Sequence, residues 1–162
     1  FGTHMKRLQD PQSHVDVFME RADRLEDHLG PILVQLPPNF HRDAARLDAF
    51  LAATPDRCRW AVEFRDESWL NDQIYDALSR RGAALCIHDM INDHPRVTTA
   101  DWVYLRFHGG DDGDYPYQAL VASAKRIESW LADGLDVYAY FNNDMGGHAV
   151  RNAQALRRYV NS

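Results

Sequence analysis

The stretch of sequence that decides the fold is Val103-Tyr104-Leu105-Arg106-Phe107-His108. Apolar residues occupy every second position, which is the two-residue period of a β-strand. Val103, Leu105 and Phe107 share one face of this strand. The other face carries Tyr104, Arg106 and His108. We therefore expect a strand over residues 101–108 with one face in a core and a polar opposite face.

Four other short apolar stretches divide in the same way, and in each the polar side chains gather near the C-terminal end. Their expected strands cover residues 32–36, 59–64, 83–88 and 135–141. On the polar face they place Gln35, Glu63 with Arg65, His88, and Tyr138 with Tyr140 and Asn142.

Amphipathic stretches with helical periodicity alternate with these strands. We expect helices over residues 11–29, 43–53, 68–81 and 116–134, and a closing helix around Val150, Ala153 and Leu156. Alternating strands and helices predict a parallel sheet built from βαβ units. Strands that are polar on one face near their C-terminal ends favour a barrel over an open doubly wound sheet. The predicted fold class is therefore α/β and TIM-barrel-like, here an incomplete barrel of about five strands. Since no linker divides residues 1–162, we expect one domain.

Composition and charge restrict the function classes. The chain has 162 residues, 45% of them hydrophobic and 26% charged, which is typical of an ordinary globular domain. Its net charge of -6 gives no strong signal for nucleic-acid binding. No apolar run approaches the ~20 residues of a membrane span, and no secretion signal is seen, so we expect a cytoplasmic protein. Cys58 and Cys86 are expected to be reduced thiols.

Four stretches of the sequence carry a family resemblance. They are residues 29–38 (Leu-Gly-Pro-Ile-Leu-Val-Gln-Leu-Pro-Pro), 62–69 (Val-Glu-Phe-Arg-Asp-Glu-Ser-Trp), 104–109 (Tyr-Leu-Arg-Phe-His-Gly), and 138–144 (Tyr-Ala-Tyr-Phe-Asn-Asn-Asp) followed by Gly147-His148-Ala149. These motifs resemble the YecE-like family, also called domain of unknown function 72 (DUF72). Residues 3–8 also resemble the segment before the family's fourth strand, which supports a native start of the sequence. The resemblance implies a TIM-barrel-like fold and no settled activity.

The resemblance also implies a departure from the family pattern. The first three strands of the family have no counterpart here, so the chain corresponds to the C-terminal two-thirds of the domain. A complete (β/α)8 barrel usually takes about 250 residues. We therefore expect open sheet edges at the strands that contain Ile32 and Leu135, and association through those edges.

Glu63 is the leading candidate for a catalytic carboxylate. Buried glutamates are rare without a partner, and Arg65 is placed to keep it ionised. As a functional group, Glu63 would act in acid/base catalysis, together with His108 as the second catalytic candidate. The alternative is purely structural: an ion pair between Glu63 and Arg106 that braces the barrel interior.

An anion-binding corner is expected beside these residues. The guanidinium groups of Arg65 and Arg106 suit carboxylate or phosphate, and the loop at Gly109 would add backbone donors. The acidic residues Asp111, Asp112 and Asp114 in the same loop would repel an anion. The full set of ligand-binding candidates is Gln35, Arg65, Asp66, His88, Arg106, Gly109, Asn142 and Asn143.

Three hypotheses for function follow. The first is an enzyme-like barrel that binds a small anionic or polyhydroxylated ligand, with no cofactor indicated. The second is a metal-dependent phosphoesterase or nuclease, in which a divalent metal would take ligands from Glu63, His88, Asp89 and His108; no tight ligand spacing supports it, and no metal residue is assigned. The third is a non-catalytic binding module.

Overall fold

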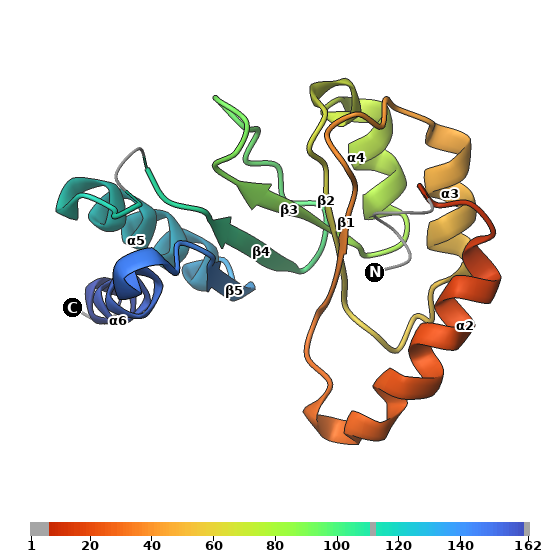
Figure 1. Cartoon of the computed structure of the whole chain (residues 1–162), viewed down its shortest axis with the longest axis horizontal. Helices are drawn as coiled ribbons and strands as arrows, with labels where there is room; N and C mark the ends of the chain where they lie inside the picture. Colours follow the sequence, from red (N-terminus) through yellow and green to blue (C-terminus); the bar gives the residue numbers. More distant parts are fainter. Residues whose placement is uncertain (1–6, 111–112, 161–162) are drawn as a thin grey trace. The chain divides into compact units, whose positions relative to one another are not determined.

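Five parallel β-strands pair in sequence order within residues 7–110 and 113–160, the part of the chain that the computed structural model describes. They are β1 (Ile32–Gln35), β2 (Trp60–Glu63), β3 (Ala84–His88), β4 (Trp102–Phe107) and β5 (Asp136–Phe141) (Figure 1). Each lies inside its predicted range. The α/β class with parallel strands, consistent with an incomplete TIM-barrel-like fold, is therefore confirmed. Of residues 3–8, only Arg7 and Leu8 belong to the described part.

Helices connect most of these strands. The α-helices are α2 (Pro11–Ala22), α3 (Ala44–Ala53), α4 (Asp72–Ser79), α5 (Tyr117–Ala132) and α6 (His148–Val160), with short 3-10 helices η1 (Asp23–His28), η2 (Glu67–Trp69) and η3 (Met145–Gly147). The segment between β3 and β4 contains no helix.

Two predicted helices differ from the structure at their ends. The helix expected to reach Leu29 ends at Ala22 and continues as η1, in which Glu26 has a φ of 46°. Leu25 is 53% exposed there, so the apolar stripe no longer faces a core. The helix expected to start at Ser68 is η2 followed by α4, because the side chain of Asn71 caps α4 by accepting from the Ile74 N–H.

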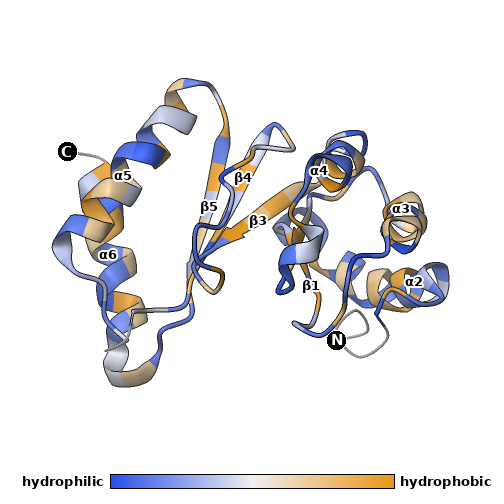
Figure 2. Cartoon of the chain, turned by 90° about the horizontal axis from the view of Figure 1, so that it is seen from above, coloured by the Kyte–Doolittle hydropathy of each residue, from blue (hydrophilic) through white to orange (hydrophobic). Residues whose placement is uncertain are grey.

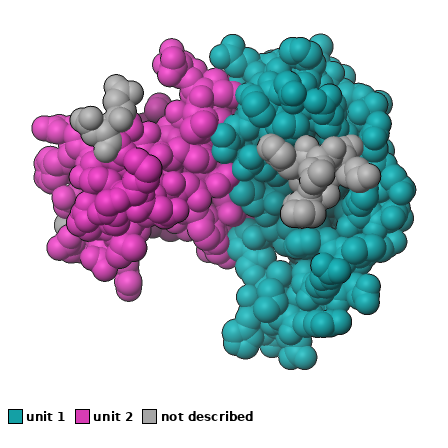
Figure 3. Space-filling model, in the orientation of Figure 1, with its two compact units in different colours: residues 1–85, 97–100 teal, residues 86–96, 101–162 magenta. Residues whose placement is uncertain are grey.

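The chain divides into two compact units, shown in different colours in Figure 3. Unit 1 contains the residues up to Leu85 and residues 97–100, and unit 2 contains residues 86–96 and the chain from Asp101 onward. Strand β3 belongs to both: its Ala84 and Leu85 pair with β2, and its remaining residues pair with β4. The division does not decide the number of folding domains, so the single domain stays a prediction.

Each unit has its own apolar core on the predicted strand faces. In unit 1, Val34, Val62 and Phe64 are buried in one cluster with residues of α2, α3 and α4. In unit 2, Val103 and Leu105 are buried with residues of α5 and α6, which lie side by side (Figure 1). Strand β3 is apolar along most of its length (Figure 2). The alternation read from the sequence therefore gives the correct core face for both units.

Thr99 joins residues 97–100 to the start of β3 within unit 1 by two hydrogen bonds. This buried side chain accepts from the Leu85 N–H at 2.8 Å and donates to the Ala83 carbonyl at 2.7 Å. One hydroxyl therefore satisfies two backbone groups at the start of β3, a region where water cannot replace it.

We predict that Thr99→Val destabilises the protein by about 1–3 kcal/mol, because it keeps the side-chain shape and leaves two buried backbone groups unpaired. Urea unfolding of the full chain measures the change. The matched control is Thr98→Val at the exposed neighbouring position, with an expected change within about 0.5 kcal/mol. Equal effects of the two variants would show that the hydroxyl does not stabilise β3.

Candidate functional site

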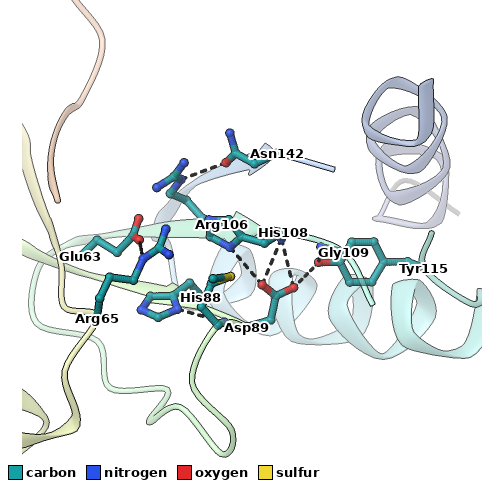
Figure 4. Close-up of polar contacts among 10 residues, drawn as sticks. Glu63, Arg65, His88, Asp89, Arg106, His108, Gly109, Tyr115 and Asn142 are labelled. Carbon is teal, nitrogen blue, oxygen red and sulfur yellow. Dashed lines mark hydrogen bonds and ion pairs between the residues drawn. The ribbon is translucent and has the colours of Figure 1, made fainter. Parts of the chain in front are cut away.

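Asp89, the first residue after β3, forms hydrogen bonds with His108, the first residue after β4. Its Oδ1 accepts from the His108 backbone N–H at 3.0 Å and lies 3.1 Å from His108 Nδ1 (Figure 4). A carboxylate can only accept, so this contact places the imidazole hydrogen on Nδ1. Nε2 is then the basic nitrogen of the neutral ring, which is the arrangement of an oriented acid/base histidine.

Tyr115 completes the same cluster. Its hydroxyl donates to Asp89 Oδ2 and accepts from the Gly109 N–H at 2.7 Å (Figure 4). The tyrosine ring packs at steep angles on Phe107 and Phe141, with centroid distances of 5.6 and 5.9 Å. Apolar contacts therefore hold the Tyr115 ring, and two hydrogen bonds position its hydroxyl.

Gly109 is required by both its conformation and its surroundings. Its φ is 100°, a backbone conformation that residues with a side chain rarely adopt. A Cβ at this position would also lie 2.9 Å from the Gly113 carbonyl oxygen and 3.0 Å from the Cβ of Asn143. The glycine thus lets the loop close against the segment after β5.

The cluster favours an ionised Asp89. Burial raises the pKa of its carboxyl, but the hydrogen bonds from the His108 ring, the Tyr115 hydroxyl and the His108 N–H outweigh burial and leave the pKa below its usual value. For Tyr115, burial and then the hydrogen bond to Asp89 raise the pKa far above the ordinary tyrosine range. Tyr115 is therefore a donor at neutral pH, and Asp89 is an acceptor.

Arg106 and Asn142 meet at the ends of β4 and β5. Arg106 Nε donates to Asn142 Oδ1 at 3.0 Å, and the Asn142 N–H donates to the Phe107 carbonyl at 2.7 Å (Figure 4). His88, buried at the end of β3, accepts on Nδ1 from the Met90 N–H at 3.2 Å. Its ring centroid lies 6.1 Å from that of His108. The carboxyl ends of β3, β4 and β5 thus bring together His88, Arg106, His108, Gly109 and Asn142.

Asn143 is built into the scaffold beside this group. It is buried, and its Nδ2 donates to the Gly113 carbonyl at 2.7 Å and to Asn152 Oδ1 at 2.8 Å. Asn152 in turn donates to Asp114 Oδ1 at 2.8 Å. These bonds fix the end of the loop on α6. Asp111 and Asp112, expected to repel an anion, lie outside the described residues.

Unit 1 places the other candidates at the ends of its own strands. Glu63 ends β2, is completely buried and forms an ion pair with Arg65 Nε (Figure 4). Gln35 ends β1 and pairs in register with Glu63. The expected partnership of Glu63 with Arg65 is therefore present, and it compensates the burial of a charge.

Asp66 serves the local structure of unit 1. Its Oδ1 accepts from the Ser68 N–H at 3.0 Å and from the Ser68 hydroxyl, and its Oδ2 lies 3.0 Å from His41 Nδ1. The bond from the Ser68 N–H caps η2, so this carboxylate stabilises the local structure. Its role in ligand binding stays a prediction.

The described residues contain no group of three or more His, Cys, Asp or Glu side chains that could hold a metal ion. Over the same part of the chain, no helix is long and apolar enough to cross a membrane.

Tyr115 is the member of the cluster that sequence reasoning missed. It lies 26 residues from Asp89, after a glycine- and aspartate-rich loop, and no periodic pattern links the two. Asp89 itself carried a signal, because a polar residue directly after a parallel strand lies at the functional end of the sheet.

The whole chain, residues 1–162, matches the family model described as protein of unknown function DUF72. A crystal structure of a DUF72 family protein from Thermotoga maritima is 23% identical, with a TM-score of 0.80 over 100% of this chain and 72% of that one. Two crystal structures of a DUF72 family protein from Enterococcus faecalis are 21% and 23% identical, with TM-scores of 0.80 and 0.77. They cover 95% and 91% of this chain and 67% and 68% of theirs. No curated protein matches. At these identities, the structural likeness establishes the fold.

We predict that Tyr115→Phe lowers the free energy of unfolding by about 1–3 kcal/mol at neutral pH, toward the lower end because Asp89 is partly exposed. The folded pKa of Asp89 is depressed, so its stabilisation is present above the pKa of the unfolded chain and disappears as the pH falls through the folded pKa. The difference between wild type and variant should therefore shrink in acid.

Urea unfolding at neutral pH and at about pH 3, below the ordinary aspartate pKa, measures this difference. Tyr117→Phe is the control, since Tyr117 is 61% exposed on α5. A difference that stays constant with pH would show that the hydroxyl does not act through the Asp89 carboxylate.

Proposed function

We propose that this chain, which belongs to the DUF72 family of proteins of unknown function, binds a small anionic ligand at the carboxyl ends of β3, β4 and β5, with His108 as an acid/base group. The observation that carries the proposal is the contact of Asp89 with both the ring and the backbone of His108. A scaffold role alone would need only the backbone contact. The ring contact also selects the tautomer that proton transfer requires.

Arg106 supplies the charge for an anion. Asn142 accepts from its Nε and thereby fixes the direction of the guanidinium, whose planar fork matches carboxylate or phosphate. Since the Asp89 carboxylate is already bonded to His108 and Tyr115, its repulsion of a ligand anion is reduced. The proposed ligand group is therefore a phosphate or a carboxylate beside Arg106 and His108.

Glu63 remains a second catalytic candidate within unit 1. Burying the charge of Glu63 completely is unfavourable in free energy, and the ion pair with the Arg65 guanidinium offsets part of that penalty. We propose it as a general acid or base on these grounds, with a structural ion pair as the alternative. The metal-dependent alternative has no group of three metal-binding side chains in its favour among the described residues.

Binding is tested with inorganic phosphate as the probe, followed by NMR of uniformly labelled protein. We expect saturable shifts at His108, and Arg106→Met should weaken binding about ten- to a hundredfold, the equivalent of losing one charge-assisted contact. Arg158→Met, which removes an exposed arginine of α6, should leave the affinity within about twofold. Absence of saturable shifts, or equal effects of both variants, would refute anion binding at this position.

Acid/base action is tested with p-nitrophenyl phosphate. His108→Gln should lower the hydrolysis rate by about a hundredfold or more, while the exposed control His28→Gln should leave it unchanged. Phosphate binding without turnover, or turnover that is the same in His108→Gln, would exclude the acid/base role and leave a binding module. Glu63→Gln in the same assay separates catalysis from an ion pair, provided that its thermal unfolding is unchanged.

A further inference from the structure

A pocket of about 310 Å³ lies within unit 2, on the face of β3 and β4 that packs against α5. Residues 89–101 join these two strands without a helix, whereas a helix separates each of the other successive strand pairs that the structure describes. This irregular segment supplies part of the pocket wall, namely Asp89, Ile91, Asn92, Asp93, His94 and Arg96. The volume of the pocket falls at the lower end of the range of small-molecule sites, roughly 300–1,000 Å³.

Three arginines line this pocket: Arg106, which belongs to the site proposed above, and two others, Arg96 and Arg126. Arg96 comes from the segment after β3, and Arg126 projects from the middle of α5. Burial and then the charge of Arg96 lower the pKa of Arg126, so the two guanidinium groups repel each other across the site. Neither forms an ion pair with a carboxylate among residues 7–110 and 113–160.

The acidic residues of the pocket do not neutralise this pair. Asp89 borders the pocket, but its oxygens bind His108 and Tyr115. Asp93 is the other lining carboxylate, and it is exposed to solvent. A half-buried arginine beside a second arginine is an unfavourable arrangement that a bound anion would relieve.

One part of the wall is apolar and aromatic, while His88, Asn92 and His94 add polar groups elsewhere. Ile87, Leu105 and Phe107 come from the core face of the strands, and Trp130 lies one helical turn after Arg126 on α5. Ser123, one turn before Arg126, adds a hydroxyl. A flat apolar group suits this lining, because aromatic walls bury such groups with little loss of conformational freedom.

We propose that this pocket binds a phosphate monoester with a flat apolar body, its phosphate held between Arg96 and Arg126 and its body packed against Trp130 and Leu105. Two guanidinium groups match a dianion better than a carboxylate, which carries one charge. The pocket adjoins the site proposed above, because Arg106, Asp89 and Tyr115 also line it. Arg96, Arg126 and Trp130 are not used by that site, and they distinguish the second proposal from the first.

The test uses phenyl phosphate with the full chain, followed through the indole N–H signal of Trp130, which Trp130→Phe assigns. We expect a saturable shift of this signal, and Arg126→Met should weaken binding about tenfold or more. Lys125→Met is the matched control, because it removes one exposed positive charge at the neighbouring position of α5 and should change the affinity less than about twofold. Should Arg126→Met fail to fold, Arg96→Met provides the same test at an exposed position.

Phenol and inorganic phosphate are tested separately. Phenol that binds as tightly as phenyl phosphate would overturn the phosphate role, and inorganic phosphate that binds as tightly would overturn the role of the flat body. No saturable shift at Trp130, or equal losses in Arg126→Met and Lys125→Met, would overturn the pocket as a site. A shift at His108 without one at Trp130 would locate binding at the other site alone.

Discussion

The carboxylate of Asp89 is the acceptor on which the polar end of unit 2 depends. It takes hydrogen bonds from the backbone and ring of His108 and from the hydroxyl of Tyr115. Three donors on one carboxylate hold it ionised despite its partial burial. The ends of β3 and β4 and the segment just before α5 are thereby fixed to one charged group.

The same carboxylate connects local structure to chemistry. Through Tyr115 it reaches Gly109, whose positive φ lets the loop after β4 approach the segment after β5. Through the ring of His108 it sets the tautomer of the one histidine that directly follows β4. The residues that shape this end of the sheet are therefore also those that would move a proton.

Alternation along the strands was sufficient to predict the core faces, because one face of each strand must be buried and the period of two leaves no choice of register. The pairing of Glu63 with Arg65 was also predictable, since the two share a face two positions apart. Tyr115 was not, because its contact with Asp89 depends on how a loop of glycines and aspartates folds. The structural roles of Asp66 and Asn143 were equally hidden, since caps and loop anchors leave no periodic signal.

The pocket lined by Arg96 and Arg126 could not be predicted from the sequence. Its only trace in the sequence is the missing helix between β3 and β4, and the segment that replaces it has no pattern that would place Arg96 near Arg126. Long-range juxtapositions of this kind follow from the packing of α5 on the sheet. Such contacts between distant residues can be identified only from the three-dimensional structure.

The tautomer of His108 can be measured by long-range proton–nitrogen NMR of the imidazole ring, in buffer basic enough to keep the ring neutral. Hydrogen bonding to Asp89 predicts that the proton lies on Nδ1 and that Nε2 carries the lone pair. A neutral ring protonated on Nε2 would contradict the orientation of His108 by Asp89, and with it the acid/base role proposed for this residue.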